Sequence, residues 1–438
     1  MKPNPVYHIC AVLTGLLAVT SAAVGQEPLS FRRAVELALS QSSQMGLSHA
    51  DEVRAYQTYL EARDSYIPKL AVGSDIGYAH GFPLSLEGSA PTLFNVTTQS
   101  SVWNPALRDF IKAAKADWRA SKSQGSDQRA QVIMDTALTY IELNRWESRV
   151  PILRAELNVA ENVEYTVAER VKEGIDKAIE RTEAELVQTQ VRMHMTEAEG
   201  AVDILRTRLS QLTGLPANAI KTVRDSIPVL KEDTHPNDVV SPQVQSSPAA
   251  VAAAEQSAEA KQLRARAEHR ALYPSADFAA QYGLVNTSLT NFEQFFVPHS
   301  FQPNNVTFGL LLRFPFLDRS QRARASAADA EALRARKEIE QTKNKAALDV
   351  LKLQHSVEQL LAARHIADLR YKLAENQLAA VRVRMEAVTT TQREMQNAAI
   401  DAGERTLERI DADFELQRAE LELLRVKGEV ESWALSSR

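Results

Sequence analysis

The sequence predicts a mainly α-helical fold with a small β part, built from two copies of one helix–strand–strand–helix–helix unit. Proline is absent from residues 316–438 and occurs only once, as Pro151, in residues 106–215. These stretches are rich in Ala, Glu, Leu, Arg and Gln, which favours long helices. Segments with apolar residues at every second position occur at equivalent places in both copies, and such alternation is typical of β-strands.

The duplication is visible as residues that recur at a nearly constant offset. Residues 62–68 align with residues 268–274, so that Pro68 corresponds to Pro274 at an offset of 206. Further along the chain the offset is 214, which pairs Gly214 with Gly428. An offset that stays nearly constant along most of the chain indicates an internal repeat.

The repeat divides the chain into four parts. We predict a signal peptide over residues 1–25, a first repeat over 26–214, a connector over 215–247 and a second repeat over 248–438. The connector is rich in Pro, Ser, Asp and Val and lacks a helical period. We therefore expect it to lie against the helices, with short structure of its own.

The first 25 residues have the pattern of a secretory signal peptide. Lys2 supplies positive charge, residues 9–19 are largely apolar, and small residues precede a predicted cleavage at Gln26. The apolar run is short for a membrane anchor. The one cysteine, Cys10, lies in this segment, so we expect no disulfide and no thiolate metal site in the secreted chain.

Each repeat should contain three helices. The first repeat predicts helices over residues 31–66, 106–172 and 176–213, with Pro68 ending the first and Gly214 capping the last. The middle helix would be about 100 Å long, and Pro151 is expected to kink it or change its register. The second repeat predicts helices over residues 249–272, 319–387 and 392–434. Leucines and valines between Leu348 and Val381 recur mostly at spacings of three, four or seven residues, which favours a coiled-coil-like seam between helices. An ordinary helical bundle is the alternative.

Four alternating segments predict strands at about 69–79, 94–103, 275–285 and 305–316. The second is weaker and mostly polar. Segments of about ten residues with one apolar face and one small or polar face, in a secreted chain, favour a transmembrane β-barrel over a soluble hairpin packed on a core. Four strands cannot close a barrel, and an open edge in lipid leaves backbone groups unpaired. The barrel must therefore be shared between chains. The apolar face of the fourth segment consists of Val306, Phe308, Leu310, Leu312, Phe314 and Phe316.

The chain resembles the TolC family of outer-membrane efflux proteins over nearly all of the predicted secreted part. The resemblance is carried by the duplicated element order, by Pro68 and Pro274 before the strands, and by Arg170 four residues before Gly174-Ile175. The end of the first repeat, residues 209–216, also matches. The resemblance implies a homotrimer with a 12-stranded transmembrane barrel and a long α-barrel tunnel in the periplasm.

The same resemblance implies a function and partners. It implies a passive exit duct of a tripartite efflux pump or type I secretion system, located in the outer membrane and surrounded by its lipid. The implied partners are a periplasmic adaptor, also called a membrane fusion protein, and an inner-membrane transporter of RND or ABC type. The net charge of −5 gives no sign of nucleic-acid binding. A secreted coiled-coil structural or adhesive protein is the alternative, and the exported substrate is not predicted.

The resemblance also implies site residues. The helical turns, with Gly174 and Ile175 in the first repeat and Val388 and Thr391 in the second, would contact the adaptor. The family usually has Gly where this chain has Val388, so the second turn departs from the family pattern. Thr391 fits the usual Ser or Thr three residues after the Gly position, whereas Lys177 does not.

A narrow periplasmic aperture is implied further along the second return helix. Acidic residues six and nine positions after the Gly position line it in the family, and these positions hold Glu394 and Asn397 here.

No catalytic, cofactor or metal site is predicted. The sequence has no phosphate-binding glycine loop after a strand and no His-Glu-x-x-His motif, so we expect no enzyme activity. Met193, His194 and Met195 resemble a soft-metal ligand set, but consecutive helical residues point about 100° apart and do not converge on one ion.

Overall fold

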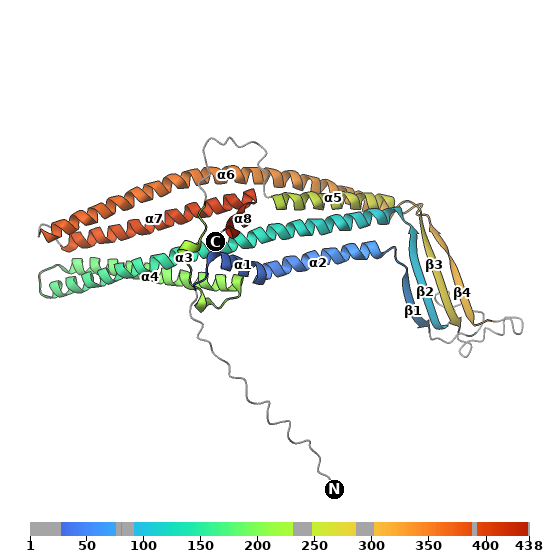
Figure 1. The fold of residues 1–438 in the computed structure, drawn as a ribbon, viewed down its shortest axis with the longest axis horizontal. Helices are drawn as coiled ribbons and strands as arrows, with labels where there is room; N and C mark the ends of the chain where they lie inside the picture. Colours follow the sequence, from blue (N-terminus) through green and yellow to red (C-terminus); the bar gives the residue numbers. More distant parts are fainter. Residues whose placement is uncertain are drawn as a thin grey trace, which may run out of the picture.

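The molecule consists of long helices that run side by side, with one four-stranded sheet at their end (Figure 1). This computed structural model describes residues 28–75, 80, 92–230, 248–285, 302–387 and 392–436. The predicted signal peptide, residues 1–25, lies outside the described residues. No helix in the described part of the chain is long and apolar enough to cross a membrane.

Two helices of 68 residues each form the frame: α3 (Pro105–Lys172) and α6 (Arg319–Glu386). At 1.5 Å per residue each is about 100 Å long. Asn104 caps α3 by accepting hydrogen bonds from the backbone N–H groups of Ala106 and Leu107 at 3.1 and 3.2 Å, with Pro105 following it. Helix α3 continues through Pro151 as a single element.

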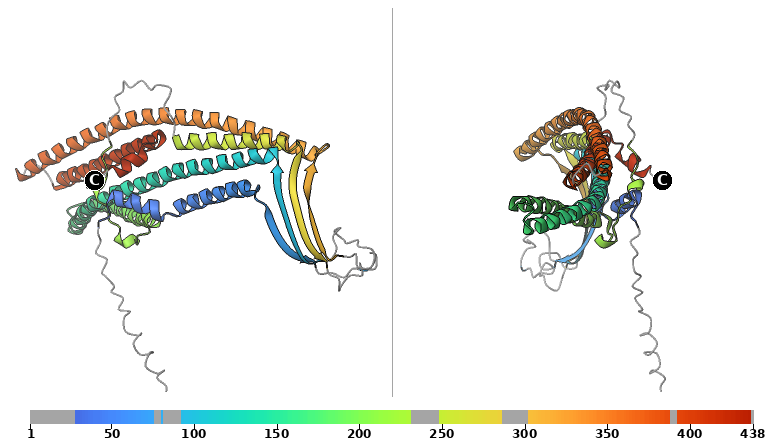
Figure 2. Two further views of the ribbon diagram at one scale, coloured as in Figure 1. Left: turned by 45° about the vertical axis from the view of Figure 1, so that its right-hand side comes forward. Right: turned by 90° about the vertical axis from the view of Figure 1, so that its left-hand side faces the viewer.

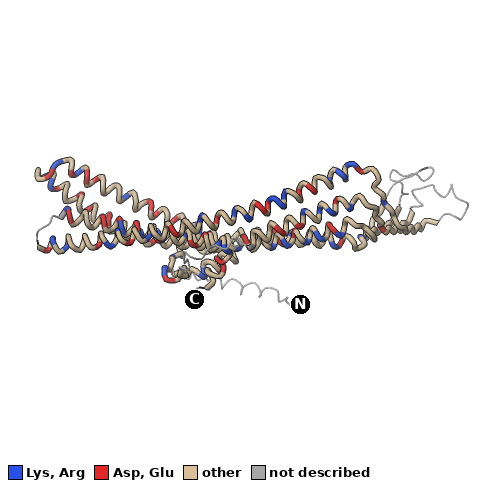
Figure 3. Tube along the Cα trace, turned by 90° about the horizontal axis from the view of Figure 1, so that it is seen from above, with Lys and Arg blue, Asp and Glu red and all other residues tan. Residues whose placement is uncertain are grey.

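Shorter helices accompany the long pair over half their length each. Beside the sheet these are α2 (Ser43–Asp64) and α5 (Pro248–Arg270), and toward the far end they are α4 (Ala178–Thr213) and α7 (Gln392–Lys427) (Figure 1). Each half of the chain thus has the order helix, two strands, long helix and return helix. Seen from the end, the helices form a curved layer (Figure 2). Acidic and basic residues are mixed along their lengths (Figure 3).

The single opening helix predicted over residues 31–66 is wrong, because the chain breaks at Ser42. Helix α1 (Phe31–Gln41) ends there, and α2 begins at Ser43. Ser42 has extended backbone angles, and its hydroxyl accepts a hydrogen bond from the N–H of Met45 at 3.4 Å. A capping serine offers the backbone an alternative to the helical hydrogen bond, so a helix can end within a stretch whose other residues favour helix.

The single last helix predicted over residues 392–434 is also wrong. Helix α7 ends at Lys427, and a short α8 (Val430–Leu435) follows. Gly428 between them has a φ of 79°, and the N–H of Glu429 donates to the carbonyl of Leu424 at 2.9 Å. Gly214, its counterpart, has a φ of 74° and caps α4 as predicted.

The described part of the connector lies against the middle of the helices. It contains two short 3₁₀ turns, η1 (Ala217–Ala219) and η2 (Arg224–Ser226), and Thr222 forms a parallel bridge with Leu29. Residues 231–247 lie outside the described residues.

The main hydrophobic core is at this mid-level and joins both halves of the chain. Tyr140 of α3 is fully buried, its hydroxyl donates to the carbonyl of Leu29 at 2.6 Å, and its ring packs edge-on against Phe31 at 5.5 Å. Burial raises the pKa of the Tyr140 hydroxyl. Other buried residues come from α4, α7, α8 and the connector: Leu205, Leu209, Ile220, Phe414, Leu421 and Val430.

The predicted α6 seam is only partly correct. Val357 and Val381 are buried and Leu360 and Leu361 pack against a buried cluster, but four other leucines of the predicted seam are half exposed in the single chain. Alanines such as Ala367 and Ala374 also lie in the buried stripe of α6. The exposed leucines are Leu348, Leu351, Leu369 and Leu373.

All four predicted strands form one antiparallel sheet in the order β1-β2-β3-β4. They are β1 (Lys69–Asp75), β2 (Thr92–Trp103), β3 (Ser275–Val285) and β4 (Asn304–Arg313). Residues 76–79 of the first predicted strand lie outside the described residues. The fourth strand ends at Arg313 rather than at residue 316, since Pro315 has no N–H to donate to a ladder.

Candidate functional site

The first turn at the far end of the molecule is shaped by Gly174. It has a φ of 76°, and its N–H donates to the carbonyl of Val171 at 3.0 Å, while the N–H of Ile175 donates to that of Arg170 at 2.9 Å. This pair of bonds is a Schellman motif, which needs a left-handed residue and therefore favours glycine. Ile175 is 61% exposed at the end of the hairpin.

The side chain of Arg170 also stabilises this turn. Its Nε and Nη2 donate to the two carboxylate oxygens of Asp176 at 2.7 and 3.0 Å. Hydrogen bonding from Arg170 holds the pKa of the Asp176 carboxyl below its usual value. Lys177 occupies the N-cap of α4 and makes no side-chain cap, which is the structural consequence of lacking Ser or Thr there. The turn is thus held by a bidentate ion pair instead.

The predicted residues of the second turn, Val388 and Thr391, lie outside the described residues. Helix α6 ends at Glu386 and α7 begins at Gln392, so the chain does reverse there. Glu394 and Asn397 lie in the first two turns of α7, and both are exposed.

A groove of about 510 Å³ separates the α3–α4 hairpin from α7 near these ends. Asn397 lines the groove together with Arg170 and Asp176, whereas Glu394 is not among the lining residues. The structure therefore brings Asn397 and the first turn to the same groove. An ion pair between Arg393 of α7 and Glu183 of α4, with 3.4 Å between Nη2 and Oε2, crosses the groove. No local pattern in the sequence marks this pair, because its two residues lie on helices far apart along the chain.

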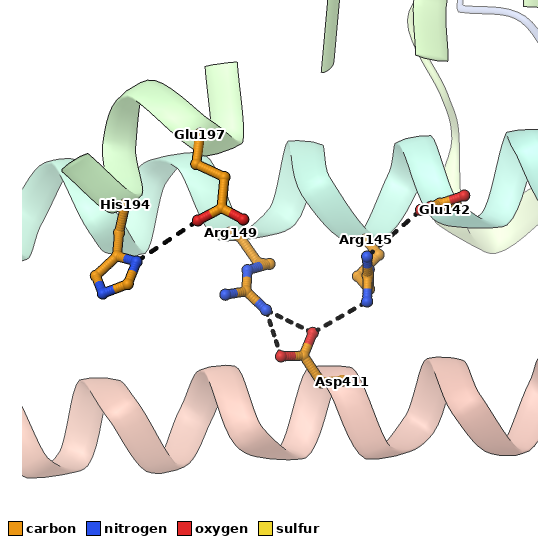
Figure 4. Close-up of polar contacts among 6 residues, drawn as sticks. All are labelled: Glu142, Arg145, Arg149, His194, Glu197 and Asp411. Carbon is orange, nitrogen blue, oxygen red and sulfur yellow. Dashed lines mark hydrogen bonds and ion pairs between the residues drawn. The ribbon is translucent and has the colours of Figure 1, made fainter. Parts of the chain in front are cut away.

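A second polar cluster, at mid-length, was also missed by sequence analysis (Figure 4). Nη1 of Arg149 contacts both carboxylate oxygens of Asp411, and Nη1 of Arg145 lies 3.4 Å from one of them. Both arginines are largely buried, with side-chain exposures of 16% and 15%, and burial lowers the pKa of Arg145. The Arg145 guanidinium also lies 4.3 Å from the ring centre of Phe414. The cluster ties α7 to α3, and with them the two halves of the chain.

The residues considered as a metal set do not converge. Met195 is buried against α3, Met193 is 58% exposed, and Nδ1 of His194 lies 3.6 Å from Glu197 (Figure 4). Within the described ranges no group of three His, Cys, Asp or Glu side chains is arranged to hold a metal ion.

The two faces of the sheet differ in chemistry. The register aligns Ala71, Thr97, Gln281 and Thr307 in one row across the four strands, and this row belongs to a small and polar face. Neighbouring rows on the opposite face are apolar, and many of their side chains are exposed. They include Leu70, Val72, Phe94, Val306, Phe308 and Leu310. Strand β2, which looked weak by sequence, contributes Phe94 and Val96 to the apolar face.

Both edges of the sheet lack a partner strand in the single chain. Strand β1 pairs only with β2 and β4 only with β3 among the described strands. An unpaired edge beside an exposed apolar face favours association with another chain.

No protein-family model matches the sequence, and comparison with curated proteins gives no significant sequence match. Solved structures do match over nearly the whole chain. An outer-membrane protein of Vibrio cholerae, VceC, is 16% identical with a TM-score of 0.72, covering 91% of this chain and 96% of its own. The CmeC outer-membrane channel of Campylobacter jejuni is 12% identical with a TM-score of 0.73, covering 91% and 85%. A membrane protein from Pseudomonas aeruginosa is 18% identical with a TM-score of 0.72, covering 91% and 90%.

Proposed function

We propose that this chain, which has the fold of the TolC-type outer-membrane channels, is itself an outer-membrane channel that acts as a passive exit duct. In this proposal the sheet lies in the outer membrane and the helices extend into the periplasm. The protein does no covalent chemistry, and energy comes from an inner-membrane transporter of RND or ABC type in a tripartite pump or type I secretion system.

One observation carries the proposal: the chain presents an exposed apolar sheet face backed by a small and polar face. An apolar face suits lipid, and a face of Thr, Gln, Ala and Gly suits an aqueous lumen. A water-soluble protein would pay a high solvation cost for leaving Leu70, Phe308 and Leu310 exposed. The alternative, a secreted structural or adhesive coiled-coil protein, does not account for this face.

The proposed assembly is a homotrimer. Three copies of four strands give the 12-stranded barrel that the resemblance implies, and closure pairs β1 of one copy with β4 of the next. The half-exposed leucines of α6 support this arrangement, because a second copy can cover a stripe that the single chain leaves in water.

The proposed adaptor contact is the far end of the helices. The exposed Ile175 at a rigid turn and the adjacent groove offer an apolar point and a polar rim for a periplasmic adaptor. Val388 and Thr391 belong to the same proposal for the second turn. Glu394 is proposed to face the channel axis, with Asn397 nearby.

Engineered disulfides test the shared barrel and its location together. Cysteine at Ala71 of β1 is combined with cysteine at Asn305, Thr307 or Gly309 of β4, since the register between chains has to be scanned. We expect one combination to give covalent trimers on oxidation in outer-membrane fractions. Cysteine at Thr97 of the central strand β2, paired with the same β4 positions, is the matched control and should give none.

Planar-bilayer recordings test conduction. The purified, detergent-solubilised trimer should insert and give discrete conductance steps. Recovery of the parent chain as a soluble protein without detergent, with no conductance, would favour the secreted structural alternative.

A further inference from the structure

The contact between α3 and α7 below the arginine cluster contains an unusual carboxylate, that of Glu156. Its Oε1 atom is fully buried and has no hydrogen-bond partner among the described residues. A buried carboxylate oxygen without a partner is costly when the group is ionised, because desolvation is not compensated. The protonated, neutral acid loses much less solvation free energy when it is buried in the same place.

Helix α7 contacts this carboxyl group at Gly403. A Cβ atom added at Gly403 would lie 2.0 Å from Oε1 and 3.0 Å from Cδ of Glu156, which is closer than atoms can approach. The backbone of α7 therefore rests directly on the carboxyl group. Any change in the space or hydration that Glu156 needs has to be accommodated by movement of α7 or of the side chain.

The charges around Glu156 do not compensate its ionisation. From α7 the neighbouring Glu404 opposes it, and from its own helix Arg149 favours it but is already held by Asp411. Arg154 of α3 lies 3.5 Å from Glu199 of α4, so these two largely satisfy each other. Burial first and Glu404 second raise the pKa of Glu156 from 4.5 to about 7.

We propose that Glu156 is a proton-binding site that couples the packing of α7 on α3 to periplasmic pH. Uptake of a proton lets α7 rest on a neutral acid, and its release places a charge in the contact and loosens it. The consequence for gating rests on the proposed function: α7 also carries Glu394 and Asn397, so loosening at Gly403 frees the predicted aperture to widen.

The direction of the pH effect follows from the raised pKa. In the packed state the group binds its proton up to about pH 7, whereas after separation it ionises from about pH 4.5 upward. Packing is therefore favoured most below pH 4.5, weakens as the pH rises toward 7 and changes little above that. Because Glu156 is partly hydrated, we expect a shift of roughly tenfold in the packing equilibrium.

Thiol labelling of the intact trimer in detergent tests the coupling without requiring conduction. Leu407 of α7 is partly buried in the same contact, and Met193 of α4 is exposed. The rate at Leu407→Cys is divided by the rate at Met193→Cys, which removes the intrinsic pH dependence of a thiol. We expect this ratio to rise roughly tenfold from pH 5 to pH 8 in the parent.

Three variants identify the residue responsible. Glu156→Gln should hold the ratio low and independent of pH, and Gly403→Ala should hold it high at every pH. Glu161→Gln is the matched control, because Glu161 is a partly exposed acid of α3 paired with Arg192, and it should keep the parental response. If Gly403→Ala fails to assemble, the double variant Glu156→Ala/Gly403→Ala should restore assembly by removing the clash.

A flat ratio in the parent, or an unchanged response in Glu156→Gln, would overturn the proposal. Bilayer recordings separate this from the proposed function. If the protein conducts but the labelling ratio does not change with pH, only the proposed proton-binding site is contradicted. If the labelling ratio changes with pH but the protein does not conduct, only the proposed channel function is contradicted.

Discussion

Single residues determine how the helical ends are shaped, and Gly174 is the clearest case. No atom lies within 4 Å of the Cβ that it lacks, so any cost of replacing it comes from its positive φ rather than from a clash. The turn at Gly174 was predicted from the sequence because a tight reversal between two long helices has few solutions, and its role as an adaptor contact stays a prediction. The sequence could not predict the Arg393–Glu183 pair, which depends on two helices meeting.

Replacing Gly174 with valine should destabilise the turn by about 1–2 kcal/mol and block export while trimers still form. Export is measured as substrate release from cells, and assembly by native electrophoresis. Gly200 of α4 also has open space around its missing Cβ but lies within a regular helix, so Gly200→Ala should be neutral or slightly stabilising. Normal export from Gly174→Val would argue against the turn as the adaptor contact.

Replacing Glu394 with glutamine should lower cation selectivity in planar bilayers and weaken block by multivalent cations. Three carboxylates around a threefold axis would attract cations, and Asn397 adds no charge to them. Trimer assembly should not change, because an exposed helical Glu contributes little to stability. Identical selectivity and block in the mutant and the parent would place Glu394 away from the constriction.

At the scale of elements, the mispredicted boundaries have one cause: single residues that end a helix inside a helical pattern. Ser42 and Gly428 divide helices that propensity alone extends. The helical stretches around them are long and favourable, so a summed preference hides one capping residue. The strands were found because an alternating pattern is local, whereas the apolar half of β2 became clear only from its register with β3.

Replacing Ser42 with alanine should lower the stability of the α1–α2 junction by about 1 kcal/mol, since the cap of α2 is lost and the site is buried. The thermal midpoint of the trimer measures the effect. Ser43→Ala is the neighbouring control, because Ser43 is exposed and makes no cap. Equal midpoints for both variants would show that the break does not depend on the Ser42 hydroxyl.

Replacing Asp411 with asparagine should destabilise the contact between α3 and α7 by about 2–3 kcal/mol. Arg149 would then remain largely buried without its counter-charge, and Arg145 would keep only Glu142, 3.6 Å away, so the loss exceeds the value of the pair itself. Glu422→Gln removes a partly exposed partner of Arg418 and should change the free energy of unfolding by less than about 0.5 kcal/mol, with little change in the thermal midpoint. Similar midpoints for the two variants would contradict a structural role for the cluster.

At the scale of the whole molecule, the unpaired β1 and β4 edges determine which oligomeric state we expect to purify. Trimers that dissociate on heating should appear in mild detergent, because closing the barrel satisfies both edges at once. Semi-native electrophoresis with and without boiling measures this. A well-folded monomer in the same detergent would contradict the shared barrel.

The sequence predicted the element order, the strands and the two long helices, because repeats and periodicity are written along the chain. It did not predict the joint between the halves. Glu156 and Gly403, like Arg149 and Asp411, lie far apart in sequence and look like ordinary members of charged helices. Only the crossing of α3 and α7 gives them a role, so such sites stay hidden from any local pattern.

The continuity of α3 has a mechanical consequence. From Arg149, where the joint holds it, to its last residue Lys172, α3 rises about 35 Å. A continuous helix of that length acts as a lever arm: a tilt of about 5° at the joint displaces its tip by about 3 Å. A change of side-chain size at mid-length, such as the loss of one proton or one ion pair, is thus amplified into a movement comparable to half a helical turn where the duct would open.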